Sequence, residues 1–226
     1  MVQSDPGAGP RALDQARRPR ATKPPDQRRR EILEAATELF REQGFDTTTV
    51  QTIATSAGVA AGTVYLHFPS KEAILVALQV EFEAGLLDRF AEISQAVLSE
   101  EDASGEIVTY QEVVIRLIDG IVDYGLEHRR ECQVMARHVG RIAILPDAPI
   151  VTGGLTDVLA RVIQEGIRLG YVHTSDAEMA AYLLNLAAIT GIGHAIAFED
   201  EATVDRVVRQ VKELYIKALA PERPES

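Results

Sequence analysis

With 226 residues, 46% of them hydrophobic, the chain can bury a sizeable core, which excludes disorder over its whole length. Its single cysteine, Cys132, excludes a disulfide within the chain and fits a reducing cytoplasm, and no apolar segment follows the N-terminus, so we expect no secretory signal. The formal net charge of −11 is unusual for a protein that binds nucleic acid, so the distribution of the charge matters.

The first 30 residues are basic, whereas the rest of the chain is acidic. Residues 1–30 carry eight arginines and lysines against three aspartates, a net +5, so the other 196 residues carry −16. Residues 1–25 contain five prolines and almost no large apolar side chain, which predicts a disordered basic arm. Such an arm can reach DNA phosphates or serve only as a solvated tail, and the sequence favours neither.

A first helix is predicted from Gln27 to Gln43, with Asp26 as its N-cap. Apolar residues recur along it at helical spacing: Ile32, Ala35, Ala36, Leu39 and Phe40. Gly44 stands where a left-handed residue ends a helix, and Phe45 can then fold back onto Phe40.

The segment 49–68 has the pattern of two short helices that meet at a sharp angle. Thr49 can cap a helix from Val50 to about Ala57, and a second helix runs from about Ala60 to His67. This geometry needs a small residue where the helices cross and a glycine in the turn, which Ala54 and Gly58 supply. The miniature core would come from Ile53, Val59, Val64 and Phe68.

The remainder of the chain also has helical patterns. Ser70 can cap a long helix from Lys71 to about Leu98, followed by a polar loop at 99–105. Gly170 and the capping-box spacing from Ser175 to Glu178 mark later breaks. Further helices are predicted near 106–128, 131–144, 150–169, 176–198 and 202–219. No alternating strand pattern is convincing, so the predicted fold is all-α with about nine helices.

The stretch from Met179 to Phe198 has no formal charge and approaches the length of a membrane span. Asn185 and His194 would then lie in hydrocarbon, and the flanking residues are acidic rather than basic. A helix that is apolar all round can equally be buried in protein. We therefore predict a helix with protein on both sides, as a dimer interface would provide.

The second helix of the 49–68 pair can place its N-terminal end in the major groove of DNA. Ala60, Ala61 and Gly62 are small enough there for close approach, and Thr63 can contact a base edge or a thymine methyl group. The 25 residues from Thr47 to Lys71 carry one charge, the lysine, so no acidic side chain there would repel phosphate.

At this point the sequence resembles the DNA-binding domain of the tetracycline-repressor (TetR) family over residues 28 to about 75. The resemblance rests on Phe45, Thr48-Thr49-Val50, Ile53-Ala54, Ala57-Gly58-Val59, Gly62-Thr63-Val64-Tyr65 and His67-Phe68-Pro69-Ser70-Lys71-Glu72-Ala73. It implies that the residues facing DNA are Thr49, Gln51, Ala61, Gly62, Thr63, Tyr65, His67 and Lys71. Ala61 is smaller than the polar residues often found at its position, so sequence choice should depend on Thr63, Gln51 and DNA shape.

Three of these residues have other possible roles. Tyr65 could be a half-buried core aromatic, His67 could make a structural hydrogen bond to the backbone, and Lys71 could be a solvated lysine in a first helical turn. Phosphate contact is the role that the surrounding motif favours for each of them.

The resemblance also implies an all-helical homodimer with three parts. These are a basic arm at 1–25, a helix-turn-helix domain at 26–72, and an effector-binding and dimerisation domain at 73–226 that pairs through its last two long helices. The predicted function is a cytoplasmic, ligand-responsive transcriptional repressor that leaves a near-palindromic operator when a small, apolar or amphipathic effector binds. The alternative is a dimeric small-molecule-binding protein that does not bind DNA.

Candidate effector contacts are Met135, His138 and Asn185, although ordinary packing is an alternative for each. His128 and Cys132 are four residues apart, but His138 lies off their helix face and arginines crowd the region, so we expect no metal site. No phosphate loop, nucleophile elbow or pair of catalytic carboxylates is present in the sequence, so we expect neither a cofactor nor an enzyme.

Overall fold

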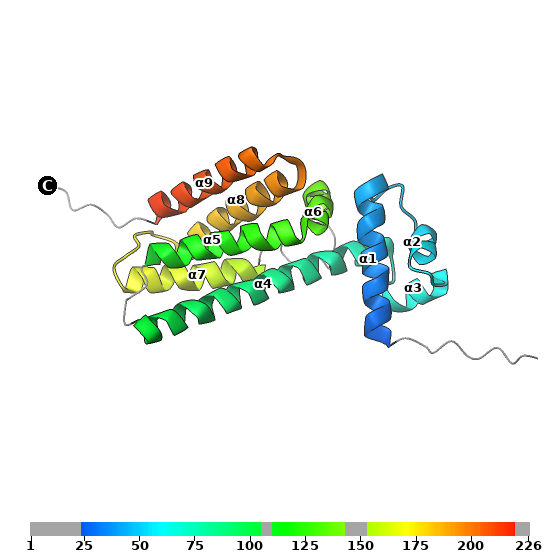
Figure 1. Cartoon of the computed structure of the whole chain (residues 1–226), viewed down its shortest axis with the longest axis horizontal. Helices are drawn as coiled ribbons and strands as arrows, with labels where there is room; N and C mark the ends of the chain where they lie inside the picture. Colours follow the sequence, from blue (N-terminus) through cyan, green and yellow to red (C-terminus); the bar gives the residue numbers. More distant parts are fainter. Residues whose placement is uncertain (1–23, 105–109, 143–152, 220–226) are drawn as a thin grey trace, which may run out of the picture.

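The computed structural model describes residues 24–104, 110–142 and 153–219, which form α-helices and contain no strand (Figure 1). The all-α prediction is thereby confirmed. The predicted basic arm lies almost entirely outside the described residues. The helices are α1 (Pro25–Gln43), α2 (Val50–Ser56), α3 (Ala61–His67), α4 (Lys71–Ser104), α5 (Tyr110–Glu127), α6 (Arg129–Ile142), α7 (Gly153–Arg168), α8 (Ala177–Phe198) and α9 (Glu201–Ala218).

Helix α1 begins earlier than predicted, because a proline rather than an acidic side chain starts it. Pro25 occupies the first helical turn, where a residue without an N–H is tolerated, and the N-cap residue is Pro24. The prediction that Asp26 is the N-cap is therefore wrong; it lies within the first turn. Gly44 ends α1 with φ +83°, and the rings of Phe40 and Phe45 lie 5.1 Å apart, as predicted.

Side-chain caps fix the starts of α2 and α4. The Thr49 hydroxyl accepts from the N–H of Thr52 at 3.1 Å, while the N–H of Thr49 donates to the Thr52 hydroxyl at 3.0 Å. Ser70 Oγ accepts from the N–H of Ala73 at 3.1 Å, so α4 begins at Lys71 as predicted. Both predicted caps are confirmed.

Two later boundaries differ from the prediction. Helix α4 continues through residues 99–104, because this segment contains good helix formers and no glycine or proline before Gly105. The cap of α8 is Asp176, whose carboxylate accepts from the N–H of Met179 at 2.9 Å. The predicted capping box from Ser175 to Glu178 is therefore wrong by one residue at its start.

Two hydrophobic clusters divide the helices, and α4 contributes to both. The N-terminal cluster contains buried residues of α1, α2 and α3, the start of α4 up to Leu78, and Val134 of α6. The C-terminal cluster is built from α4 to α9. Helix α4 therefore runs from one cluster into the other, and Figure 1 shows α1–α3 at one end of the molecule with α6 at the nearer end of the helical bundle.

Helix α8 is long and apolar enough to cross a membrane by length and composition alone. In the structure it packs against α5, α6, α7 and α9, and 44% of its most apolar stretch of 18 residues is buried. Asn185 lies on its buried side and Leu183 on its exposed side. Helix α8 is thus the central helix of the C-terminal cluster, with one apolar strip left at the surface.

Candidate nucleic-acid interface and internal cavity

Helices α2 and α3 form the small-residue crossing that the sequence predicts. Ala54 is fully buried, and its carbonyl accepts from the N–H of Val59 at 2.9 Å. Gly58 has φ +66°, a conformation that side chains other than glycine rarely adopt. With Ile53 and Val64 buried beside them, this pair of helices has the geometry of a helix-turn-helix.

The eight residues predicted to face DNA all retain accessible surface. Thr49, Gln51, Gly62 and Tyr65 are exposed, while Ala61, Thr63, His67 and Lys71 are half-buried. Tyr65 is 56% exposed, which argues against the alternative of a core aromatic. Six of the eight lie in α2 and α3, Thr49 directly precedes α2, and Lys71 begins α4. Figure 1 shows α2 and α3 on the side of α1 that faces away from the C-terminal bundle.

Lys71 has a structural role that the sequence did not reveal. Its ammonium donates to the carbonyl oxygens of Phe45 at 2.6 Å and Thr48 at 2.7 Å, and it lies 4.2 Å from the centre of the Phe45 ring. The lysine therefore ties the start of α4 to the segment between α1 and α2. These bonds use two of its three N–H groups, so a phosphate contact would use the third.

Replacing Lys71 with alanine should consequently reduce stability as well as DNA affinity. Two charge-assisted hydrogen bonds to backbone carbonyls are lost, and we expect the free energy of unfolding to fall by about 1–3 kcal/mol. Urea denaturation measures this change. Lys217→Ala is the control, because that exposed lysine pairs with Glu213 one turn away on the same helix, and it should change stability by less than about 0.5 kcal/mol. Equal stability of the two variants would contradict the structural role.

The sequence interpretation missed Leu66, which is 85% exposed on α3. It lies four residues after Gly62 and therefore on the same helix face, next to Tyr65. Of the large hydrophobic side chains in the described ranges, none is more exposed. The four-residue spacing from Gly62 was the signal in the sequence that could have identified it.

Three consecutive arginines lie near the start of α1, at residues 28–30, and two of them have partners within the protein. Arg28 pairs with Glu31 at 2.8 Å on α1. Arg29 pairs with Glu81 of α4 and lies 5.1 Å from the centre of the Phe68 ring. Arg30 is exposed. Arg29 therefore helps to hold α1 against α4 and against Phe68, the residue that follows α3, in addition to any contact with DNA.

A cavity of about 170 Å³ lies among α4, α5, α6, α7 and α8. Its walls are mainly apolar and include Phe82, Leu86, Ile121, Leu155 and Ile189. Cys132 also lines it, and burial raises the pKa of this thiol to about 12. The thiol contacts the carbonyl oxygen of Gly125 at 3.6 Å, so it is a packed, neutral group rather than a reactive one.

Of the three residues predicted to contact an effector, Met135 lines this cavity. The His138 ring instead lies 5.8 Å from the ring of Phe45, near the N-terminal cluster. Asn185 lines a separate cavity of about 20 Å³, and its amide donates to the Thr156 hydroxyl at 3.1 Å. The structure thus brings only Met135 to the large cavity.

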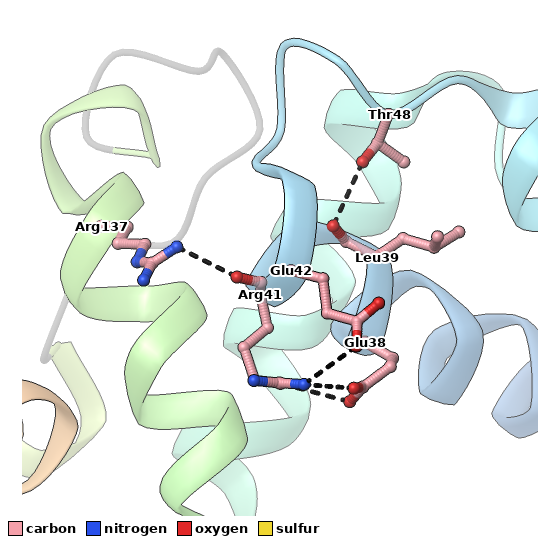
Figure 2. A network of polar contacts seen from close by, with 6 residues as sticks. All are labelled: Glu38, Leu39, Arg41, Glu42, Thr48 and Arg137. Atoms are coloured by element: carbon pink, nitrogen blue, oxygen red, sulfur yellow. Dashed lines mark hydrogen bonds and ion pairs between the residues drawn. The ribbon is translucent and has the colours of Figure 1, made fainter.

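Helix α6 joins the cavity to the N-terminal helices. Val134 is fully buried within the N-terminal cluster, and its neighbour Met135 packs against that cluster while lining the cavity. The Arg137 guanidinium donates to the carbonyl oxygen of Arg41 in α1 at 3.0 Å (Figure 2). On the side toward α8, the Gln133 amide donates to the carbonyl of Ala197 at 3.0 Å. Movement of α6 would therefore act on both α1 and α8.

Figure 2 also shows how the end of α1 is held. The Arg41 side chain pairs with Glu38 and Glu42, and its hydrogen bond to Glu38 keeps the pKa of that carboxyl below its ordinary value. The Thr48 hydroxyl contacts the carbonyl oxygen of Leu39 at 3.4 Å. The carbonyl oxygen that accepts from Arg137 thus lies at the end of α1, and a hydrogen bond from Thr48 links this end to the segment before α2.

Within the described ranges, no group of three or more histidine, cysteine, aspartate or glutamate side chains is arranged to hold a metal ion. His128 stacks on Tyr124 with ring centres 4.3 Å apart, whereas His138 faces Phe45. The three side chains considered for a metal site therefore have separate surroundings.

Comparison with known proteins places this architecture. Residues 32–78 match the family model described as bacterial regulatory proteins, tetR family. The regulator YhgD of Bacillus subtilis is 24% identical over 164 residues, covering 70% of this chain and 78% of that protein. The repressor KstR2 of Mycolicibacterium smegmatis is 32% identical over 110 residues, covering 42% of this chain and 54% of that protein.

Solved structures agree over a larger part of the chain. A tetR-family regulator from Syntrophomonas wolfei has a TM-score of 0.67 at 21% identity, covering 84% of this chain and 96% of that one. The fatty acid degradation regulator FadR from Bacillus halodurans has a TM-score of 0.63 at 21% identity, covering 85% and 95%. At such identities these structures show that the fold is shared. The match to the family model lies in the helix-turn-helix part of the chain, at residues 32–78. This part thus matches the tetR family of bacterial regulatory proteins, and the chain shares the fold of these solved structures over most of its length.

Proposed function

We propose that the chain is a cytoplasmic homodimeric repressor that leaves a near-palindromic operator when a small molecule occupies the cavity among α4–α8. The observation that carries the regulatory part is the position of α6. Met135 faces the cavity, and the next residue toward the N-terminus, Val134, is buried among α1–α4. A ligand that displaces Met135 must therefore disturb the packing of the DNA-binding helices.

The DNA-binding part is supported by the surface of α3. Gly62, Tyr65 and Leu66 are exposed along one face, and the segment from Thr47 to Ser70 contains no acidic side chain. A dimeric small-molecule-binding protein that does not bind DNA has no need to expose such a face. This surface favours a DNA-binding regulator over the alternative of a small-molecule-binding protein without DNA binding.

The dimer is supported by apolar side chains that remain exposed on α8 and α9. Met179, Leu183 and Phe198 on α8 and Leu214 on α9 are each at least 40% exposed. Several large apolar side chains exposed on two neighbouring helices are typical of an interface. Two copies related by a twofold axis would cover it and place two α3 helices on one face of the DNA.

Two routes connect the cavity with the recognition helices. One route is α4, which contributes to both hydrophobic clusters, and the other is α6. Gln79 and Phe82 of α4 line the cavity, while Ile74 and Leu75 of the same helix lie in the N-terminal cluster. Tilting either helix would change the separation of the two α3 helices in a dimer.

The experiment is a gel shift with promoter-region DNA, repeated with ligand that co-purifies with the protein and is identified by mass spectrometry. We expect retarded bands with DNA and an affinity reduced roughly 5–150-fold by the ligand. Absence of any sequence-dependent shift would contradict DNA binding. A ligand that binds the cavity tightly without changing DNA affinity would contradict the regulatory part alone.

Contacts to phosphate and contacts to bases should respond differently to mutation. Tyr65→Phe removes a hydroxyl that reaches phosphate, so it should weaken binding to all sequences by similar factors. Thr63→Ala should instead change the preference among operator variants. Fluorescence-anisotropy titrations on a panel of single-base variants distinguish the two. Interchanged effects would show that the two roles are assigned the wrong way round.

Leu66 should make an apolar contact with DNA, and thymine methyl groups are the apolar feature of the major groove. Replacing thymines of the operator by uracil, one at a time, removes only the methyl group. At one or two positions we expect roughly threefold to fourfold weaker binding, as one buried methyl group warrants. The Leu66→Ala variant should be insensitive to the same replacement. If Leu66→Ala instead weakens binding to all sequences equally, and uracil replacement does not change the affinity of the wild type, then Leu66 contacts the sugar-phosphate backbone.

A further inference from the structure

The cavity among α4–α8 has the size of a single ring. Its volume is about 170 Å³, and its walls are mainly apolar. An apolar protein cavity of about 150 Å³ stays dry and binds one benzene molecule. The cavity in this protein therefore has room for one six-membered ring with a short substituent, whereas a four-ring molecule or a long acyl chain would not fit inside it.

Two side chains that contain sulfur line this space. Cys132 and Met135 lie three residues apart on α6, and therefore on one face of that helix. The chain contains one cysteine and three methionines, so two of its four sulfur-containing residues line the cavity. Sulfur atoms are polarisable and make favourable contacts with aromatic rings. A ring that enters the cavity gains such contacts only if it is aromatic.

Phe82 of α4 supplies an aromatic ring to the same cavity. This ring meets that of Tyr124 edge to face, with ring centres 5.2 Å apart and ring planes at 62°. Gly85 leaves room for Tyr124, because a Cβ atom at Gly85 would clash with the Tyr124 hydroxyl. Phe82 is thus held by a neighbouring ring, and a ligand ring can add a further edge-to-face or offset contact to it.

We propose that the effector buries one aromatic ring in this cavity, in contact with Cys132, Met135 and Phe82. This inference rests on the proposed function, in which this cavity is the effector site. It places the ring against Met135, the residue through which α6 would respond to the effector. A saturated ring of similar size occupies the same space but gains neither the sulfur contacts nor the contact with Phe82 as a second aromatic ring.

Two probes test the proposal: benzyl alcohol and cyclohexylmethanol. Both are neutral primary alcohols with one six-membered ring, so a contact of the hydroxyl with a polar lining residue is common to both. Their binding to the full-length protein is measured by isothermal titration calorimetry. We expect benzyl alcohol to bind roughly threefold to tenfold more tightly. Cyclohexylmethanol binding equally well or better would overturn the proposal, as would a failure of both probes to bind at millimolar concentration.

A pair of methionine variants tests the sulfur contact. Met135→Leu conserves the apolar volume but removes the sulfur atom, so the preference for benzyl alcohol over cyclohexylmethanol should fall by roughly twofold or more. Met179→Leu is the matched control, because Met179 is 52% exposed on α8 and lies outside the cavity lining, and the preference should not change. The wild-type preference in a folded Met135→Leu protein would overturn the assignment of Met135.

A third variant tests whether the probes occupy this cavity. Ala136 lines it on α6, and Ala136→Phe should fill part of its volume and abolish binding of benzyl alcohol. Ala136→Leu replaces it if thermal unfolding shows that the larger side chain prevents folding. Unchanged binding in a folded variant would overturn the proposal. None of these titrations contains DNA, so they test the ring preference alone, while the gel shift tests the proposed function separately.

Discussion

Replacing Leu183 with arginine is expected to convert the protein from a dimer to a monomer and to reduce operator affinity more than 100-fold. Leu183 is 56% exposed in the N-terminal half of α8, beside the exposed side chains of Met179 and Leu186, where a dimer would bury it. An arginine there would bring two like charges close to the twofold axis in a desolvated interface. Each isolated protomer would then carry one recognition helix, and the gain from binding two linked half-sites would be lost.

Sedimentation velocity measures the first effect, as a change from twice the chain mass of 24.7 kDa to that mass. Leu169→Arg is the matched control, because Leu169 is 50% exposed at the end of α7, outside α8 and α9. It should leave both the mass and the operator affinity unchanged. A wild-type protein that sediments as a monomer at micromolar concentration would refute the dimer, and equal behaviour of the two variants would place the interface elsewhere.

The second large effect is expected at Gly62, where the fold has space for a side chain but, under the proposed function, the bound DNA would leave none. A Cβ atom added at Gly62 would meet no atom of the protein within 4 Å. Because Gly62 lies inside a helix, Gly62→Ala should even stabilise the free protein by about 0.5–1 kcal/mol. On the DNA-facing side, however, a larger side chain would hold α3 away from the base pairs.

A series from Gly62→Ala through Gly62→Val to Gly62→Leu should therefore separate stability from function. We expect a few-fold loss of operator affinity for alanine and more than a 100-fold loss for leucine, while thermal unfolding shows every variant to be folded. Normal operator affinity of a folded Gly62→Leu protein would mean that this face of α3 does not enter the groove.

Local chemistry explains which parts of the fold could be predicted from the sequence. The caps at Thr49 and Ser70 and the turn glycine Gly58 depend on residues within four positions of each other, and all three are as predicted. The error at Asp26 arose because Pro25 starts the helix instead. The end of α4 was missed because its polar sequence is compatible both with a loop and with a solvated helix.

The sites depend on contacts between distant parts of the chain, which a helical pattern does not encode. Lys71 binds carbonyl groups 23 and 26 residues away, so its structural role could not be read from its position in a first helical turn. The cavity brings Gln79 and Glu83 together with α8, more than 100 residues later. His138 and Met135 lie only three residues apart on α6, yet one lies against Phe45 and the other lines the cavity, which the helical pattern alone does not distinguish.

The most direct test of the account is the selection of bound duplexes from a random pool by the full-length protein, followed by footprinting of the enriched sequence. A dimeric regulator should enrich a near-palindromic site whose half-sites lie about one helical turn apart, roughly 34–36 Å between their centres, on one face of the duplex. An enriched site without dyad symmetry, or no enrichment above non-specific binding, would contradict it.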